Sequence, residues 1–155
     1  MNRRHFLVMG FCVAPYVSQV MAADYRKSYP DAWEASSIDT AAVALYGKEK
    51  FSSIQKSTQI ELVVPNISIV DSQTIPIVIR STMKARSVAV FQDTNPKSLV
   101  AVFNVGEEGT VDYEFNTRMD IKGTIFAVLE DLDGRLHYVR KYVDIVALSC
   151  MTSDE

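Results

Sequence analysis

The sequence predicts an all-β protein, an antiparallel β-sandwich of about seven strands that follows one short helix. Apolar residues alternate with polar ones in seven short segments, and a period of two is typical of strands with one buried face. These segments follow one another about a dozen residues apart, with no helical segment between them. This arrangement favours an antiparallel sandwich over a parallel sheet.

The stretch SSIDTAAVALYG predicts the helix. Ser37 or Asp39 is available as the N-cap, and Gly47 stands where a glycine often ends a helix. The apolar residues at helical spacing are Ile38, Ala41, Ala42, Leu45 and Tyr46. Upstream, Trp33 is expected to cover an edge of the core, with an aromatic anchor for a partner as the alternative.

The strands are expected between residues 58 and 146. They are TQIELVVP, TIPIVIRS, RSVAVFQD, SLVAVFNV, TVDYEFNT, GTIFAVLED and RLHYVRKYVDIV. Turn signals separate the later strands at Asn95-Pro96, Gly106 to Gly109, and Asp133-Gly134. Pro76 is expected on an edge strand or at a strand start, because proline has no N–H to donate to a ladder.

Residues 1–22 have the composition of a cleaved export signal. Arg3 and Arg4 precede an apolar run, and Ala22 is a small residue of the kind that a signal peptidase reads. The two arginines, followed by Phe6-Leu7, resemble the twin-arginine consensus. A transmembrane helix is the alternative, but the run is shorter than the ~20 residues that a bilayer span needs.

The expected organisation follows from this signal. Segment 23–57 carries the short helix, segment 58–146 the sandwich, and segment 147–155 a C-terminal arm and tail. We expect a periplasmic protein of about 133 residues, without stable membrane insertion. Loss of Arg3 and Arg4 leaves 14 basic residues against 19 acidic ones, a net charge of −5. This balance argues against nucleic acid as a partner.

Cys150 is the most distinctive residue for chemistry. Cys12 leaves with the signal, so the mature chain keeps one cysteine and forms no internal disulfide. A single cysteine in an exported protein indicates an intermolecular partner or a reactive thiol, because the periplasm is oxidising. A buried thiol that serves only as a small apolar side chain is the alternative.

Other candidate sites are few. His137 is the single histidine of the mature chain, and we expect a surface histidine on a strand rather than a cysteine–histidine dyad. One histidine and one cysteine argue against a zinc or copper site. Asp131-Leu132-Asp133-Gly134 resembles the start of a calcium loop but lacks its later ligands, which favours a hairpin turn. We therefore expect no metal and no cofactor.

Several motifs resemble the SoxY subunit of the SoxYZ carrier family of bacterial sulfur oxidation. NPKSLVAVF resembles the family's Asn-Pro-x-x-x-x-Ala-x-Phe segment, NTRMDI its Thr-Arg-hydrophobic strand, and DGRLHYVRKYVDI its final hairpin. The resemblance extends from about residue 31 to Cys150. It implies an immunoglobulin-like sandwich and a heterodimer with a SoxZ-like subunit.

The resemblance also implies a function. In that family, a cysteine near the C-terminus takes sulfur substrates such as thiosulfate as a covalent adduct and presents them to sulfur-oxidation enzymes. The matching position is Cys150. The protein is then a carrier rather than an enzyme, since separate enzymes act on its cargo. Four residues beyond a strand that ends near Val146 reach ~13 Å, enough to place a sulfur in an enzyme's cleft.

The arm departs from the family pattern, which is Gly-Gly-Cys-Gly at the end of the chain. Here Leu148 and Ser149 precede the cysteine, and Met151 and an acidic tail follow it. Glycines let an arm bend and enter a narrow tunnel, so Leu148 and Met151 widen it. This departure leaves an interaction module with a degenerate arm as the alternative function. An independent thiol enzyme is the third hypothesis, but no base or second thiol accompanies Cys150 in the sequence.

Overall fold

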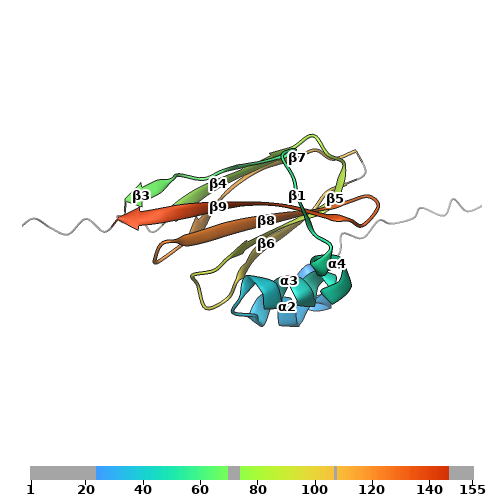
Figure 1. Cartoon of the computed structure of the whole chain (residues 1–155), viewed down its shortest axis with the longest axis horizontal. Coiled ribbons are helices and arrows are strands. Elements are labelled where there is room, and N and C mark those ends of the chain that lie inside the picture. The colour runs from blue at the N-terminus through green and yellow to red at the C-terminus, as the bar shows by residue number, and fades with distance from the viewer. Residues whose placement is uncertain (1–23, 70–73, 107, 147–155) are drawn as a thin grey trace, which may run out of the picture.

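The computed structural model describes residues 24–69, 74–106 and 108–146. Within them the chain forms four short helices and then nine strands, stacked as a helical layer, a larger sheet and a smaller sheet (Figure 1). The helices are α1 Tyr25–Ser28, α2 Pro30–Glu34, α3 Ile38–Tyr46 and α4 Lys48–Ser52. The strands are β1 Gln55–Lys56, β2 Ile60–Val63, β3 Ile67–Ile69, β4 Thr74–Ser81, β5 Ala85–Gln92, β6 Leu99–Asn104, β7 Val111–Arg118, β8 Gly123–Asp131 and β9 Leu136–Val146.

The predicted helix is α3. Ser37 is its N-cap and accepts a hydrogen bond from the Thr40 N–H at 3.2 Å. Gly47 ends it with φ 85°, a conformation that glycine adopts without steric cost. The expectation of one helix was incomplete, because α1, α2 and α4 lie beside α3. Helices of four or five residues contain too few positions to show a helical period.

All seven predicted strands are present, as β2 and β4 to β9. The larger sheet has the order β1-β9-β8-β5-β6, and the smaller sheet has the order β2-β4-β7. The main ladders are antiparallel, as expected. Two short strands were not predicted, and both β1 and β3 pair with β9 in parallel. The sandwich is therefore not purely antiparallel.

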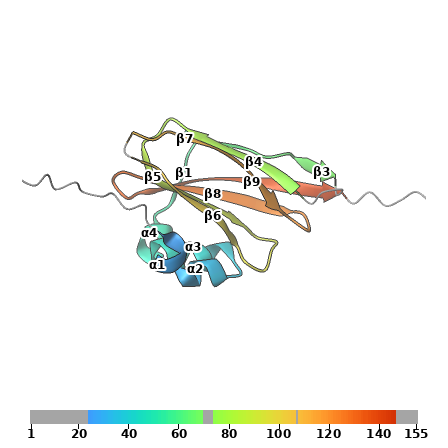
Figure 2. The same cartoon turned by 180° about the vertical axis from the view of Figure 1, so that it is seen from behind.

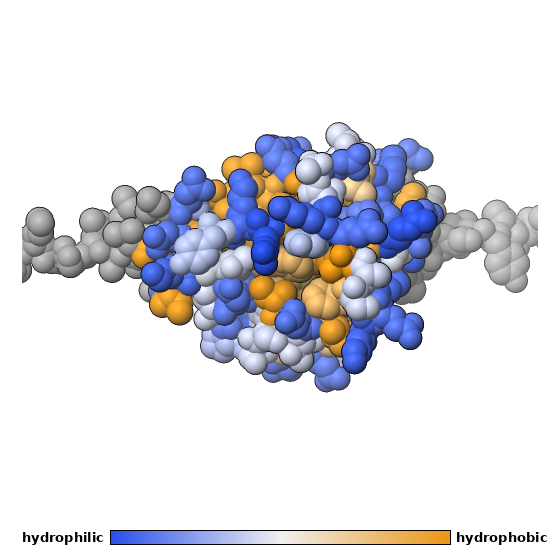
Figure 3. All heavy atoms as spheres, in the orientation of Figure 1, coloured by the Kyte–Doolittle hydropathy of each residue, from blue (hydrophilic) through white to orange (hydrophobic). Residues whose placement is uncertain are grey.

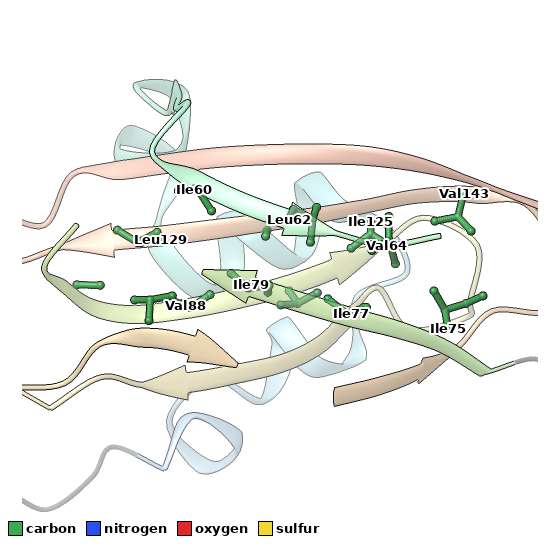
Figure 4. Close-up of a cluster of buried hydrophobic side chains, with 14 of the residues drawn as sticks. Ile60, Leu62, Val64, Ile75, Ile77, Ile79, Val88, Ile125, Leu129 and Val143 are labelled. Atoms are coloured by element: carbon green, nitrogen blue, oxygen red, sulfur yellow. The ribbon is translucent and has the colours of Figure 1, made fainter. Parts of the chain in front are cut away.

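The main core lies between the two sheets (Figure 4). Ile75, Ile77 and Ile79 of β4 are fully buried and alternate with exposed or half-buried neighbours, as their period predicts. From the larger sheet, Val88 and Leu129 meet them. This packing fixes the face that each strand turns inward, because a register slip of one residue would expose these side chains.

A second core lies between the larger sheet and the helices. Ala89, Phe91 and Val128 point away from the first core and pack with Ala42 and Leu45 of α3. Strands β5 and β8 are consequently buried on both faces over most of their length. Figure 2 shows the helices together on this side of the larger sheet. The molecule is thus a sandwich with a helical layer on one face.

Pro76 lies near the start of β4, as expected. It pairs with Asn116 of β7. On the other side, β2 reaches along β4 only to Val78, so Pro76 lies beyond the end of that ladder. A proline there removes no hydrogen bond to β2.

Candidate functional site

Strand β9 directly precedes the segment that carries Cys150. It is the longest described strand, with 11 residues, and it ends at one extremity of the molecule beside β3 (Figure 1). The predicted attachment residue Cys150 and its neighbours Leu148, Ser149 and Met151 lie outside the described residues, as do Arg3, Arg4 and Ala22 of the predicted signal. The structure therefore describes the strand that leads to the arm.

The last three residues of β9 have different neighbours from the rest of the strand. The ladder between β9 and β8 ends where Val143 pairs with Gly123. Beyond it, Asp144, Ile145 and Val146 pair in parallel with β3. The Asp144 N–H also donates to the Asn66 carbonyl at 2.9 Å. Beyond Val143, the end of β9 therefore pairs with β3 and no longer with β8.

Strand β3 was not predicted, although it pairs with the last three residues of β9. The sequence feature that indicates this strand is the alternation of Ile67 and Ile69 with Ser68, after Pro65-Asn66. A segment of three residues gives too short a pattern to distinguish a strand from a loop. Its position also depends on β9, which follows it by about 75 residues. Only the tertiary structure brings these two segments together.

His137 is not a surface histidine, so that expectation was wrong. Its side chain is 16% exposed, and its Nε2 lies 2.9 Å from Oδ2 of Asp131, which is 15% exposed. The turn between β8 and β9 returns the chain so that Asp131 covers the imidazole. His137 is therefore half-buried and paired.

The Asp131–His137 pair changes the acidity of the carboxyl group. Burial alone would raise the pKa of Asp131, but hydrogen bonds from His137 and from the Arg135 N–H hold it below its ordinary value of 3.8. Asp131 is therefore the ionised partner in this pair at neutral pH. The pair belongs to the turn and stabilises its geometry.

A dyad between Cys150 and His137 of the same chain is not compatible with the length of β9. Nine residues separate His137 from Val146, a distance of roughly 30 Å along an extended strand. Four further residues reach at most ~14 Å, so even with both side chains added the thiol falls short. A base for Cys150 would have to come from another chain.

The segment Asp131 to Gly134 is a hairpin turn, as predicted. The Gly134 N–H donates to the Asp131 carbonyl at 3.0 Å, and Gly134 has φ 81°. The Asp131 side chain accepts from the Arg135 N–H at 2.8 Å. In the part of the chain that the structure describes, no group of three or more His, Cys, Asp or Glu residues could hold a metal ion.

Trp33 lies at the edge of the second core, as expected. It is half-buried, and its Nε1 donates to the Tyr25 carbonyl at 3.2 Å. The Arg26 guanidinium lies over its ring, 4.5 Å from the centroid. These contacts hold α1 against α2, so the described contacts of this tryptophan are intramolecular.

The described surface carries scattered apolar side chains. On the face in Figure 3 they form small groups among polar ones rather than one continuous patch. The large apolar side chains that are exposed include Ile121 at 62%, Tyr142 at 56% and Leu132 at 50%. Single exposed side chains of this kind are ordinary on a protein surface. Among the described helices, none is long and apolar enough to cross a bilayer.

These features define a class of protein: an immunoglobulin-like sandwich with a helical layer, whose last strand leads into a segment with a single cysteine. Comparison with known proteins identifies the family. The chain matches the family described as sulfur oxidation protein SoxY over residues 43–150, well over half of its length. It belongs to the SoxY family.

Solved structures agree with the fold. The sulfur carrier protein SoxY from Chlorobium limicola f. thiosulfatophilum has a TM-score of 0.63 and 23% identity, covering 72% of this chain and 97% of that one. A superoxide reductase (neelaredoxin) from Ignicoccus hospitalis has a TM-score of 0.55 and 10% identity, covering 64% of this chain and 100% of that one. At these identities the likeness concerns the fold alone. No curated protein matches the chain.

Proposed function

We propose that this protein is a periplasmic covalent carrier of sulfur substrates, with Cys150 as the attachment point. One observation carries the proposal: the match to the SoxY family spans residues 43–150, and Cys150 is the last residue of that range. The structural relative from Chlorobium limicola is described as a sulfur carrier protein, which supports the same role. The carrier acts with separate enzymes and is not itself an enzyme.

The geometry of β9 supports an attachment point beyond the packed sandwich. The sandwich is packed on both sides of the larger sheet, whereas β9 continues past the end of β8 to the extremity of the molecule. Cys150 is the fourth residue beyond Val146, which gives a reach of ~13 Å. A thiol at that distance enters a partner's cleft while the sandwich stays outside.

The chemistry needs a second protein. A thiol of Cys150 and a thiosulfate ion form a cysteinyl S-thiosulfonate with the release of one proton and two electrons. A separate oxidoreductase must accept these electrons. We also propose a SoxZ-like subunit as the constant partner in a heterodimer, as the family resemblance implies.

The experiment is the intact mass of the mature protein purified from the periplasm of cells grown on reduced sulfur. A sulfur-containing adduct that is removed by mild reductant and is missing from the Cys150→Ser variant supports the carrier. In a reconstituted sulfur-oxidation system, that variant should lose all sulfur-dependent turnover. Unchanged turnover with Cys150→Ser would refute the proposal.

A second candidate function follows from the composition of the arm. Leu148, Ser149 and Met151 stand where the family pattern has glycines, which favours an interaction module that keeps the sandwich but has lost the carrier role. Under this hypothesis, Cys150 carries no sulfur adduct, and the Cys150→Ser variant still binds the SoxZ-like subunit. The mass measurement separates the two functions.

A further inference from the structure

A polar cavity lies between the helices and the larger sheet, near the start of β9. It has a volume of about 240 Å³ and is lined by Tyr25, Tyr29, Tyr46, Lys50, Arg86 and Glu130, and we call it the Tyr46 pocket. Glu130 pairs with Leu136, the first residue of β9, whereas the arm follows Val146 at the other end of that strand. Ten residues of extended strand, roughly 33 Å, separate the pocket from the start of the arm.

The Tyr46 hydroxyl is buried and has no hydrogen-bond partner. Ser87 is its nearest polar neighbour among the groups that act on its acidity, and the Ser87 hydroxyl donates to Oε2 of Glu130 at 3.3 Å. Burial raises the pKa of Tyr46 above its ordinary value of 10, and the charge of Glu130 adds to the effect. Tyr46 therefore keeps its proton and offers an unused O–H donor.

Two cations line the same pocket. Lys50 Nζ donates to Oε1 of Glu130 at 2.7 Å, and Arg86 Nη2 donates to the Leu132 carbonyl at 3.0 Å. A lysine has three donor protons and an arginine has five, so most of their donor capacity is left over. Two cationic side chains and one carboxyl group thus line the pocket.

Both oxygens of the buried Glu130 carboxylate already accept a hydrogen bond. Its side chain is 9% exposed, and it accepts from both Lys50 and Ser87. The pocket consequently has a surplus of donors and a shortage of acceptors. A buried donor without an acceptor is destabilising, and such a group in a native structure points to an ion or a water molecule.

We propose that the Tyr46 pocket binds a small tetrahedral oxyanion, of the chemical class of sulfate, thiosulfate or phosphate. The anion accepts hydrogen bonds from the Tyr46 hydroxyl, the Lys50 ammonium and the Arg86 guanidinium. The half-exposed side chain of Lys50, at 47%, and the exposed Arg86 give the anion a path from solvent. This site is separate from the attachment of cargo to Cys150.

The test is calorimetric titration of the mature protein in the Cys150→Ser background, which prevents adducts on the arm. Sulfate, thiosulfate and phosphate are titrated separately at constant ionic strength, with sodium chloride as the reference salt. We expect saturable binding at one site for at least one of the three anions. Preference for a sulfur oxyanion or for phosphate identifies the source of the ligand.

Two variants localise the site. Arg86→Gln and Tyr46→Phe should each raise the Kd about tenfold, the cost of one hydrogen bond to a charged group. Tyr113→Phe removes a tyrosine hydroxyl elsewhere, on β7, and should leave the Kd unchanged. Without anion, Tyr46→Phe should keep or raise the Tm, because the hydroxyl that it removes has no acceptor.

Three results would overturn the proposal. The first is no saturable binding of any of the three anions by the parent protein. The second is binding that neither Arg86→Gln nor Tyr46→Phe weakens. The third is a lower Tm of Tyr46→Phe without anion, which would assign the hydroxyl a structural hydrogen bond. Because Cys150 is absent throughout, none of these results depends on the carrier function.

Discussion

The backbone N–H of Asp144 donates to the carbonyl of Asn66 at 2.9 Å, at the place where β9 has passed the end of β8. This contact begins the short parallel ladder between β3 and the last residues of β9. The ladder fixes the position of the last described residues before Cys150. The end of the strand is thus held by three residues of β3 rather than by the main sheet.

Ser68→Pro should loosen this end of β9. Proline removes the N–H of the central residue of β3, so the short ladder to Asp144–Val146 weakens while the core is untouched. We expect faster amide hydrogen exchange at residues 144–146 and little change in Tm. Ser68→Ala keeps the backbone N–H and serves as the control. Equal exchange in the two variants would show that β3 does not restrain β9.

Asp131→Asn should make folding stability less dependent on pH in acid. The folded-state pKa of Asp131 is below its ordinary value of 3.8, so its contribution to stability is present above that value and is lost as the pH falls through the folded pKa. The variant should be less stable by about 1–3 kcal/mol at pH 7, with a smaller difference at pH 2. Urea unfolding at several pH values measures both effects, and an identical difference at both pH values would contradict the argument.

Gly123→Ala should destabilise the protein. An added Cβ would collide with the side chains of Thr94 and Asp93, and Asp93 is held in place because it accepts from the Thr124 N–H at 2.7 Å. Overpacking of this kind costs about 1–3 kcal/mol. Gly106→Ala is the control, because nothing lies within 4 Å of the Cβ built there. Thermal unfolding of both variants tests the difference, and similar Tm values would contradict it.

Ile77→Ala and Val78→Ala compare the two faces of β4. Ile77 is fully buried between the sheets, whereas Val78 lies on the outer face and is half-buried. We expect a loss of about 2–5 kcal/mol for Ile77→Ala and under about 1.5 kcal/mol for Val78→Ala. Equilibrium unfolding in urea gives both values. A larger loss for Val78→Ala would mean that the outer face of the smaller sheet is covered.

Replacement of Arg3 and Arg4 by lysine tests the predicted export route. The twin-arginine pathway reads the guanidinium pair, so the double variant should stay unprocessed inside the cell, with a sharp fall in periplasmic protein. The measurement is the mass and the cell fraction of the product. Arg26→Lys, in the first described helix, is the control and should be exported normally. Normal export of the double variant would point to the general secretory route.

Much of the fold was predictable because its main signals are local. The period of two in β4 depends on neighbouring residues, and Ile75, Ile77 and Ile79 face the core as that period indicates. The limits of α3 follow from Ser37 and Gly47, whose capping roles depend on the nearest backbone groups. The motifs around Asn95 and Arg135 also pointed to the family that residues 43–150 match.

Other features depend on contacts between distant segments, which no local pattern records. The burial of His137 against Asp131 depends on how tightly the β8–β9 turn closes. The parallel pairing of β3 with β9, and the burial of both faces of β5, arise only when the sheets and helices assemble. The Tyr46 pocket joins residues of α1, α3, α4, β5 and β8 that lie up to about 100 positions apart.

The sequence by itself determined the seven longer strands, the limits of the helix α3, and the presence of Cys150 near the C-terminal end of the sequence. Alternation, capping and composition are properties of the chain alone. Only the tertiary structure showed that β3 pairs with the end of β9 and that His137 is too far away to act as a base for Cys150 of the same chain. It also showed that hydrogen-bond donors lie around Tyr46. Those outcomes depend on distances across the packed sandwich, which are fixed by burial and register together.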